Sequence, residues 1–365
     1  MLAILRERGG LSRAQIAARS GLSRTTLSEI TGELLARGAI VVVTTDAALR
    51  AGSGRPAELL ALDPRSGQFM GVDLGHSRVR IAVADAAHEI IAQGHSSYAA
   101  ETPWADRLAA AFALIDRIGR ESGVGFQALQ GIGVGVAGPQ PAGSSRAEVL
   151  AAFGERFTAP VLVDNNTRFA ALAEAIADGS EAHDVLYVRL SDGIGGGLVV
   201  GGRLVAGRFG VAGEFGHIPV DRSGDVCRCG KRGCLETVAS VPAVLRACRL
   251  PTLDDLRAAL DRGDDVAAAA VERVATAVGR VLADAALILN PEQVVIGGRL
   301  VAAAPGIVER AGAIVEAELV PVGGGRPLIR AARLGDDDGA RGAIAALFRQ
   351  SPLLAGYPEA LGSTA

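Results

Sequence analysis

The chain has 365 residues, of which 49% are hydrophobic and 21% charged, a length and composition typical of a soluble protein with two or three globular domains. It contains no run of about 18 apolar residues, and residues 1–8 lack the apolar segment of a signal peptide, so we expect a cytoplasmic protein with no membrane partner. The formal net charge is −3, but residues 1–56 carry eight arginines against four acidic residues, which gives +4 there and leaves −7 for the rest. A basic end on an acidic body indicates a polyanionic partner at that end.

Residues 11–36 predict two helices joined by a tight turn. Ser12 and Gln15 form a capping-box pattern at the start of the first helix, Gly21 ends it, and Ser23 can cap the second. The second helix has one apolar face, formed by Leu27, Ile30 and Leu34. We expect a helix over residues 2–8 to complete a three-helix core, and the apolar run 39–44 to begin a wing.

The second helix begins with short hydroxyl side chains and one arginine, which suit contacts with phosphates and base edges in a major groove. The stretch Ser-Arg-Ala-x-Ile-Ala-x-x-Ser-Gly-Leu-Ser-x-x-Thr-Leu, residues 12–27, resembles winged helix-turn-helix regulators. On the arm that follows, an arginine can enter a narrow minor groove, although an inert linker fits that arm equally well. We assign DNA contacts to Arg13, Ser23, Arg24, Thr25, Thr26, Ser28 and Arg55. The alternative is a small helical subdomain with no role in DNA binding.

We expect a DNA-binding domain over residues 1–48, a linker or wing arm over 49–67, an effector domain over 68–350 and a loose tail over 351–365. The effector domain alternates strands and helices and then repeats that pattern, which predicts an α/β fold of two stacked lobes with a ligand cleft between them. The strands are expected at 68–75, 79–85, 90–97, 131–137, 185–190, 197–201, 204–206 and 294–297, and helices at 103–121 and 167–177.

Three of the four cysteines, Cys227, Cys229 and Cys234, fall within eight positions, and His217 stands ten positions before the first of them. Three thiolates and one imidazole make a closed tetrahedral site, which suits structural zinc and leaves no position open for catalysis. A disulfide among neighbouring thiols is the alternative, but nothing in the sequence indicates an oxidising compartment. Cys248 lies outside the cluster and is expected to be a small buried apolar residue.

This segment resembles the signature of the ROK family (repressors, open reading frames and sugar kinases), in which Gly-Glu-x-Gly-His precedes Cys-x-Cys-Gly-x-x-Gly-Cys-x-Glu. The resemblance implies an actin-like ATPase fold over nearly all of residues 68–350, and zinc bound by His217, Cys227, Cys229 and Cys234. It also implies that Glu214, His217 and Glu236 face a sugar, together with the polar pair Asn165 and Asn166.

Three positions depart from the pattern of the family's kinases. The first phosphate turn, Asp-x-Gly-Gly-Thr in kinases, has His76 where a glycine lets phosphate approach the backbone. The second turn, Gly-Thr-Gly-x-Gly in kinases, has Asp192, whose carboxylate would repel phosphates. The catalytic Asp aligns with Asn166, and an amide cannot take a proton from a hydroxyl at neutral pH. Asp164, two positions earlier, is the alternative base.

These observations predict a transcriptional regulator, a repressor of carbohydrate-metabolism genes, that binds operator DNA as a homodimer or homotetramer and senses a sugar or sugar derivative. Structural Zn²⁺ is the expected cofactor, and we expect neither ATP binding nor enzymatic activity. The alternative is an ATP-dependent sugar kinase of the ROK type with an appended DNA-binding domain.

Overall fold

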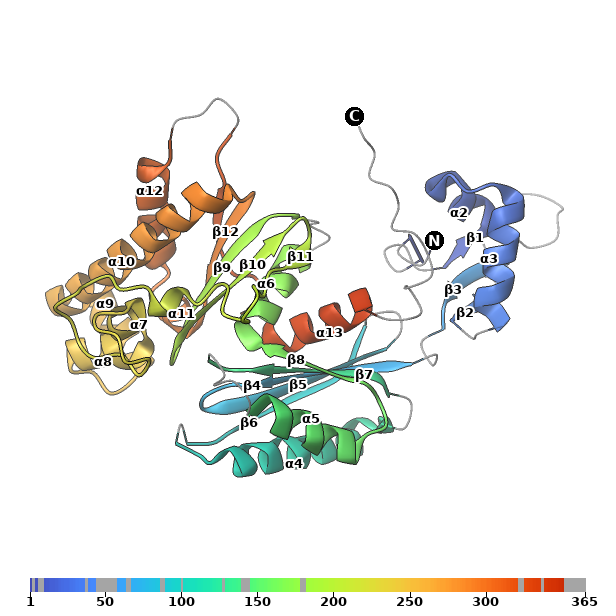
Figure 1. The fold of residues 1–365 in the computed structure, drawn as a ribbon, viewed down its shortest axis with the longest axis horizontal. Helices are drawn as coiled ribbons and strands as arrows, with labels where there is room; N and C mark the ends of the chain where they lie inside the picture. Colours follow the sequence, from blue (N-terminus) through green and yellow to red (C-terminus); the bar gives the residue numbers. More distant parts are fainter. Residues whose placement is uncertain are drawn as a thin grey trace.

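The structure is a computed structural model of the whole chain, and it places three units in space, a small winged domain and two larger α/β lobes (Figure 1). The residues that it describes are 1, 4–5, 10–36, 39–43, 58–63, 67–85, 89–99, 101–126, 129–138, 145–177, 182–320, 325–335 and 338–350.

In the part of the chain that the structure describes, the winged domain contains helices α2 and α3 and a three-stranded sheet in the order β1-β3-β2. Its elements are β1 (Leu11–Ser12), α2 (Arg13–Ser20), α3 (Arg24–Ala36), β2 (Ile40–Val43) and β3 (Leu59–Leu62). The predicted capping box is present on Ser12, and Gly21 adopts the left-handed conformation that ends α2. Ile16, Leu27 and Leu34 are buried and form the core of this domain. The predicted helix-turn-helix is therefore confirmed in its bounds and its buried face.

The wing differs from the expected boundary between domain and linker. Residues 49–67 were expected to be a linker or wing arm, but Leu59–Leu62 pair with both β1 and β2 in antiparallel register. The three-stranded sheet of the winged domain therefore reaches residue 62. Most of the helix expected over residues 2–8, the arm with Arg55 and the tail 351–365 lie outside the described residues.

The first lobe is built on a five-stranded sheet in the order β6-β5-β4-β7-β8. Helices α4 and α5 cover one face of this sheet, where Leu114 and Phe153 join its core, and the C-terminal helix α13 covers the other (Figure 1). Its elements are β4 (Gln68–Leu74), β5 (Arg78–Asp85), β6 (Ile90–Ser97), α4 (Trp104–Ser122), β7 (Leu129–Val136), α5 (Ser145–Arg156), β8 (Val161–Asn165) and α13 (Asp338–Gln350).

The second lobe repeats this architecture with a five-stranded sheet in the order β11-β10-β9-β12-β13. Helix α6 packs on one face through Ala170 and Ala171, while α10 and α12 pack on the other. The strands are β9 (Val185–Leu190), β10 (Ile194–Val200), β11 (Arg203–Leu204), β12 (Gln293–Gly297) and β13 (Leu328–Ala331). The helices are α6 (Asn166–Ile176), η4 (Phe215–His217), α7 (Leu235–Ala239), α8 (Val241–Cys248), α9 (Leu253–Asp261), α10 (Asp265–Leu289), α11 (Arg299–Ala303) and α12 (Gly306–Glu318).

Both sheets join their first three strands antiparallel and their last two parallel, so the predicted repetition of two lobes is confirmed. The lobes meet where α6 crosses α13, and this crossing is close because Gly342 packs against the backbone of Phe169. A Cβ atom at Gly342 would stand 1.7 Å from the carbonyl oxygen of Phe169. A glycine is therefore required at this point of contact.

The expected strands and helices match the structure to within a few residues, except that β10 begins at Ile194 and not at 197. Helix α5 and strands β8 and β13 were not predicted, because each is short or follows a segment rich in small residues. Among the described residues, no helix has the length and apolar character needed to cross a membrane.

Candidate functional site

A cleft lies between the two lobes and holds about 680 Å³ of empty space, part of it open to solvent. Three segments build it. The turn after β4 brings His76 and Ser77, the start of α6 brings Asn165 and Asn166, and the turn between β9 and β10 brings residues 191–195. Glu214 and three arginines of the second lobe also line it (Arg189, Arg228 and Arg299), as do Asp73, Arg78 and Arg80 of the first lobe.

Asp192 binds both lobes. Its Oδ2 accepts a hydrogen bond of 2.7 Å from the hydroxyl of Ser77, across the cleft, and its Oδ1 lies 2.8 Å from Nη1 of Arg299. The carboxylate that was expected to repel phosphates is thus already neutralised by a guanidinium. In this structure Asp192 joins the turn after β4 to the turn between β9 and β10.

Asn166 is buried on the floor of the cleft. Its Nδ2 donates a hydrogen bond of 2.7 Å to Oδ1 of Asp73, and Oδ2 of Asp73 lies 3.7 Å from Nη1 of Arg189. Arg189 also pairs with Asp338 at 2.5 Å, and the hydroxyl of Tyr187 donates to the same carboxylate. These groups form one buried polar network that connects β4, α6, β9 and α13.

The electrostatics of this network follow from its burial. Loss of hydration raises the pKa of Asp338 to about 6, although the neighbouring Arg189 opposes the shift. Burial disfavours the charge of Arg189, but the carboxylates beside it outweigh this and raise the pKa of the guanidinium above its ordinary value. Burial and the adjacent Asp338 also raise the pKa of Tyr187, whose hydroxyl therefore keeps its proton.

Asn165 caps α6 and orients Glu214. Its Oδ1 accepts hydrogen bonds from the backbone N–H of Thr167 at 2.8 Å and from the Thr167 hydroxyl at 2.5 Å. Its Nδ2 donates to Oε1 of Glu214 at 3.2 Å, and burial raises the pKa of that carboxyl. Asp164, the alternative base, forms an ion pair with Arg168. A ligand in the cleft therefore meets Glu214 already positioned by an amide.

Glu236 lies behind Arg228. Its two carboxylate oxygens accept from Nε and Nη2 of Arg228 at 2.8 and 2.9 Å, and Oε2 also accepts from the backbone N–H of Ile194 at 3.0 Å. Nη1 of Arg228 lies 3.3 Å from Nε2 of His76 in the first lobe. Because arginine only donates, this imidazole nitrogen is the acceptor. Burial first, and then the charge of Arg228, lower the pKa of His76.

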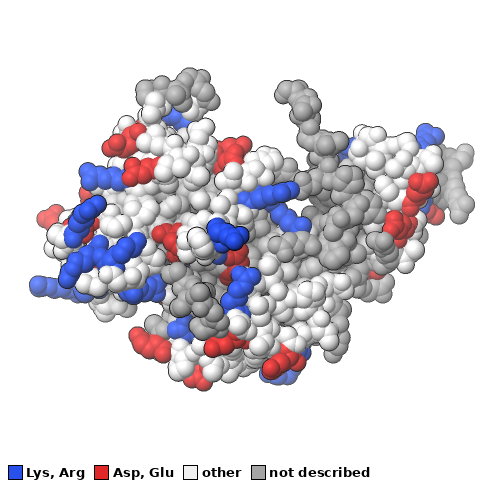
Figure 2. All heavy atoms as spheres, viewed as in Figure 1, with Lys and Arg blue, Asp and Glu red and all other residues white. Residues whose placement is uncertain are grey.

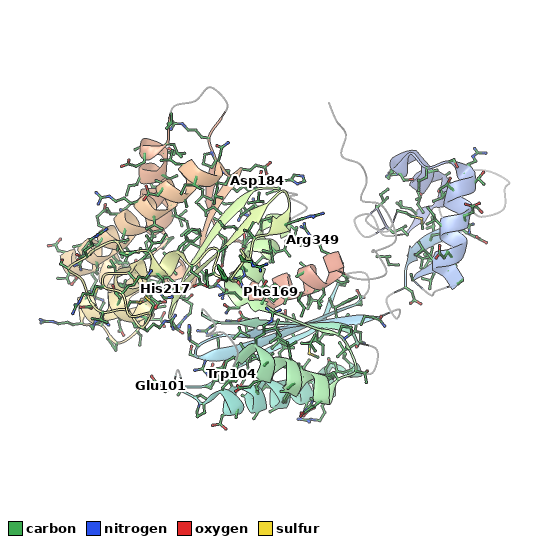
Figure 3. All side chains as sticks on the ribbon, in the orientation of Figure 1. Glu101, Trp104, Phe169, Asp184, His217 and Arg349 are labelled. Atoms are coloured by element: carbon green, nitrogen blue, oxygen red, sulfur yellow. The ribbon has the colours of Figure 1, made fainter. Side chains whose placement is uncertain are left out.

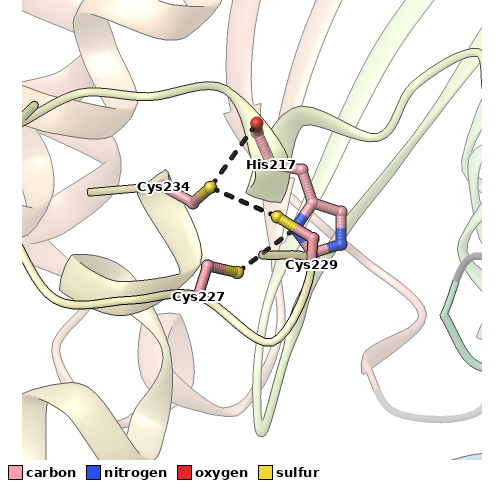
Figure 4. A group of neighbouring side chains, drawn as sticks. All are labelled: His217, Cys227, Cys229 and Cys234. Atoms are coloured by element: carbon pink, nitrogen blue, oxygen red, sulfur yellow. Dashed lines mark hydrogen bonds between the residues drawn. The ribbon is translucent and has the colours of Figure 1, made fainter. Parts of the chain in front are cut away.

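In the Cys/His cluster, the His217 ring faces three cysteines (Figure 4). Nδ1 of His217 is 3.5 Å from Sγ of Cys227, and Sγ of Cys229 is 3.6 Å from Sγ of Cys234. All four donor atoms lie within 4.8 Å of one another. Tetrahedral zinc with ordinary bond lengths would place neighbouring donors roughly 3.5–3.8 Å apart, so these residues fit that ion. Nε2 of His217 is buried and has no hydrogen-bond partner among the residues that the structure describes.

The structure brings the predicted sugar-contacting residues into one region, but only three of the five line the cleft. Asn165, Asn166 and Glu214 line the cleft itself. Glu236 reaches the cleft through Arg228, and His217 lies on the second lobe at the Cys/His cluster (Figure 3). On the face drawn in Figure 2, basic side chains gather over α8 and α9, and acidic and basic side chains alternate where the two lobes meet.

On the winged domain, Arg24, Thr25 and Ser28 are exposed on α3, as the prediction requires. The hydroxyl of Ser23 instead accepts from the backbone N–H of Thr26 at 3.1 Å and lies 2.8 Å from its hydroxyl, so these two side chains cap the helix. Arg13 forms an ion pair of 3.0 Å with Glu58, next to β3. Arg55 lies outside the described residues.

Residues 69–351 match the ROK family, and residues 1–41 match a winged helix-turn-helix DNA-binding family. The chain belongs to the ROK family. Among its relatives, the DNA-binding transcriptional dual regulator NagC of Escherichia coli strain K12 is 29% identical over 321 residues, covering 80% of this chain and 77% of NagC.

Solved structures include regulators and kinases of the same family. A ROK family transcriptional regulator, a homologue of the E. coli MLC protein, superposes with a TM-score of 0.77 and 25% identity, covering 96% of this chain and 94% of that one. The ROK hexokinase of Thermus thermophilus has a TM-score of 0.64 and 29% identity, and covers 78% of this chain and 98% of that one. The chain therefore has the organisation of the ROK regulators, with a winged domain added to the part shared with the kinases.

The sequence did not assign a role to Arg228, Ser77 or Arg299, although all three line the cleft. For Arg228 a signal was present. The residue between two closely spaced metal ligands cannot itself bind the ion and must point away from it, and an arginine there can reach several ångströms. For Ser77 and Arg299 there was none, because their partner Asp192 is 115 and 107 positions away in the chain.

Proposed function

We propose that this ROK protein is a transcriptional repressor whose winged domains bind operator DNA and whose interlobe cleft binds a sugar or sugar derivative without phosphorylating it. The observation that carries this proposal is the contact between Ser77 and Asp192, which places side chains of the protein between the two phosphate turns. A nucleotide would have to break this hydrogen bond and separate Asp192 from Arg299.

The floor of the cleft supports the same conclusion. Phosphoryl transfer requires a base beside the sugar hydroxyl, and the side chain at the corresponding position is the amide of Asn166. That amide donates to Asp73, so it holds a structural hydrogen bond and has no basic lone pair to offer. Asp164 forms an ion pair with Arg168, so its carboxylate is less available to act as the base in place of an aspartate at position 166.

The cleft is lined by polar groups that can bind the hydroxyls of a sugar. Carboxylates and amides can accept and donate hydrogen bonds to a ring of hydroxyls. Glu214 lines the cleft and is oriented by Asn165, while His217 lies in η4 and Glu236 in α7, outside the lining. We assign the sugar contacts to these residues and to Asn166.

The Cys/His cluster supports a structural role for zinc. The donor distances match tetrahedral coordination, and two of the cysteines are buried. His217, Cys227, Cys229 and Cys234 would hold the ion, and no position would remain open for substrate. When bound, zinc would cross-link the segment from which Glu214 and Arg228 enter the cleft.

For DNA binding, we assign the exposed Arg24, Thr25 and Ser28 to direct contacts, with Ser23 and Thr26 presenting the helix. A homodimer would place two winged domains about 34 Å apart, or a multiple of this distance, so that each binds one half-site of the operator. A change in the angle between the lobes on effector binding would shift this spacing and release the DNA.

The test compares Arg24→Ala with the matched variant Arg120→Ala, which removes the same charge from the exposed end of α4. DNA selected in vitro by the wild-type protein is titrated in fluorescence anisotropy. Arg24→Ala should weaken DNA binding by about 1–3 kcal/mol per winged domain, and Arg120→Ala should leave DNA binding unchanged. Equal affinity for both variants would contradict the assignment of α3. ADP release over a panel of hexoses at roughly 1–10³ s⁻¹ would establish a kinase instead.

A further inference from the structure

Arg13 and Glu58 form an ion pair on the surface of the winged domain, although they stand 45 positions apart in the chain. Nη1 of Arg13 lies 3.0 Å from Oε2 of Glu58, and the two side chains are 44% and 48% exposed. Within the described part of the chain, neither side chain forms a second ion pair. The pair is therefore isolated and open to solvent, so an incoming anion can reach the guanidinium.

The backbone holds both members of this pair in place. Strand β1 pairs with β3 so that Ser12 lies opposite Leu59, and Arg13 and Glu58 are the next residues beyond this pair in the antiparallel register. Arg13 is also the first residue of α2, whose start is fixed by the capping box between Ser12 and Gln15. The contact is therefore set by the register of the sheet, and not by a chance meeting of two long side chains.

The position of Arg13 suits a phosphate of the DNA backbone. In helix-turn-helix proteins the second helix enters the major groove, while the first crosses the backbone of the duplex. Here α3 is the second helix and carries the exposed Arg24, and α2, which begins at Arg13, is the first. Phosphate contacts position a domain on the duplex without reading the bases. Arg13 is therefore expected to affect the affinity for DNA and not the choice of operator.

The carboxylate of Glu58 opposes this contact in two ways. It occupies the guanidinium that a phosphate would need, and its own negative charge repels the phosphate. An exposed ion pair contributes little to the stability of a protein and is screened by salt, so this one can be exchanged without unfolding the domain. A phosphate, in contrast, offers arginine a bidentate charge-assisted partner, and its neutralisation releases condensed counterions from the DNA.

We propose that Glu58 limits the affinity of the winged domain for DNA by holding Arg13, and that on binding the guanidinium exchanges Glu58 for a phosphate of the DNA backbone. Arg13 is then a phosphate contact, and Glu58 is a positioning residue that acts through it. This inference rests on the proposed function, because it concerns the DNA interface of the same winged domain.

The experiment measures binding of the full-length protein to DNA selected in vitro, by fluorescence anisotropy at several salt concentrations. Glu58→Gln should bind about three- to fivefold more tightly for each winged domain, near the upper end for the release of an exposed ion pair. Arg13→Gln should bind more weakly and should reduce the slope of log K against log salt by about 0.9 for each winged domain, because one phosphate contact is lost. Thermal unfolding of both variants checks that they remain folded.

A double-mutant cycle assigns the gain in affinity to the pair. In the Arg13→Gln background, Glu58→Gln should change the affinity by less than about twofold, the usual limit of additivity. The control is Glu29→Gln, which removes the same charge from an exposed position on α3 and should have the same effect in both backgrounds. Arg13→Ala, with the best helix former at the start of α2, replaces Arg13→Gln in the cycle if that variant does not fold.

The outcomes separate this inference from the proposed function. No gain from Glu58→Gln, or a gain that survives in full without Arg13, would overturn the exchange between the two partners. An unchanged salt slope in Arg13→Gln would also overturn it, because Arg13 would then stay with Glu58 in the complex. Each of these results, with DNA binding still weakened by Arg24→Ala, would leave the proposed repressor intact. If Arg24→Ala had no effect, the DNA interface itself would be wrong, and this inference with it.

Discussion

The buried network around Arg189 allows the sharpest prediction of stability. The Arg189 side chain is 12% exposed and stands between Asp338, at 1%, and Asp73, at 5%. Arg189→Gln would remove the guanidinium and leave two carboxylates facing each other out of water. Breaking a buried ion pair from one side costs about 3–5 kcal/mol, since the remaining charge is uncompensated. We expect the free energy of unfolding to fall by that amount at pH 8.

The same substitution should depend on pH in a defined direction. The pKa of Asp338 in the folded protein is about 6, above its ordinary value of 3.8, and loss of Arg189 would raise it further. A group with a raised pKa contributes stability at low pH that is lost as the pH rises through the folded pKa. The deficit of Arg189→Gln relative to wild type should therefore be smaller at pH 5, below the folded pKa of Asp338, than at pH 8.

The assay is urea unfolding followed by the fluorescence of Trp104, the only tryptophan, which lies at the start of α4 in the first lobe and not in the winged domain (Figure 3). The control is Arg246→Gln, which breaks an ion pair with Asp225 whose partners are 63% and 72% exposed. That pair should contribute 0–1 kcal/mol. A loss below about 1 kcal/mol for Arg189→Gln at pH 8, equal to that of the control, would refute the reasoning from burial.

Three further predictions follow from particular contacts. Cys234→Ala removes a buried donor of the Cys/His cluster, so metal analysis should find about one ion fewer per chain and calorimetry a lower melting temperature, whereas Cys248→Ala, outside the cluster, should retain the ion. The Asp338 carboxyl lowers the free energy of unfolding as the pH rises from about 4 to about 6, and Asp338→Asn should abolish this pH dependence, measured by urea unfolding across that range. Gly342→Ala should destabilise by 3 kcal/mol or more, about the upper end for overpacking, because its Cβ would meet the Phe169 carbonyl oxygen at 1.7 Å, and Gly154→Ala on α5 should be neutral or slightly stabilising, because nothing lies within 4 Å.

The sequence predicted the architecture well because hydrophobic periodicity and local caps determine it. The capping box on Ser12 and the left-handed Gly21 are contacts between near neighbours in the chain, so they can be inferred from spacing alone. The repeated order of strands could be inferred because both halves carry the same alternation of apolar runs. Strand β13 was missed because its four residues follow a segment without a periodic pattern.

The candidate site was predictable only where its residues are close in sequence. The Cys/His cluster was found because its ligands span 18 positions, from His217 to Cys234. The pairing of Ser77 with Asp192 joins residues 115 positions apart and depends on how the two lobes meet. For the same reason the sequence assigned repulsion to Asp192 and could not anticipate that Arg299 neutralises it.

The free energy of the hydrogen bonds across the cleft is comparable to what the binding of a ligand can supply. The bond from Ser77 to Asp192 and the approach of Arg228 to His76 are two contacts that join the turn after β4 to the second lobe. Hydrogen bonds to charged groups contribute about 1.5–3 kcal/mol each, less where water reaches them. Shifting a two-state equilibrium from 1:99 to 99:1 requires roughly 5.5 kcal/mol of differential affinity. Two such bonds add to the packing of α6 against α13 and to the buried network around Arg189, and they are weak enough for a ligand in the cleft to replace.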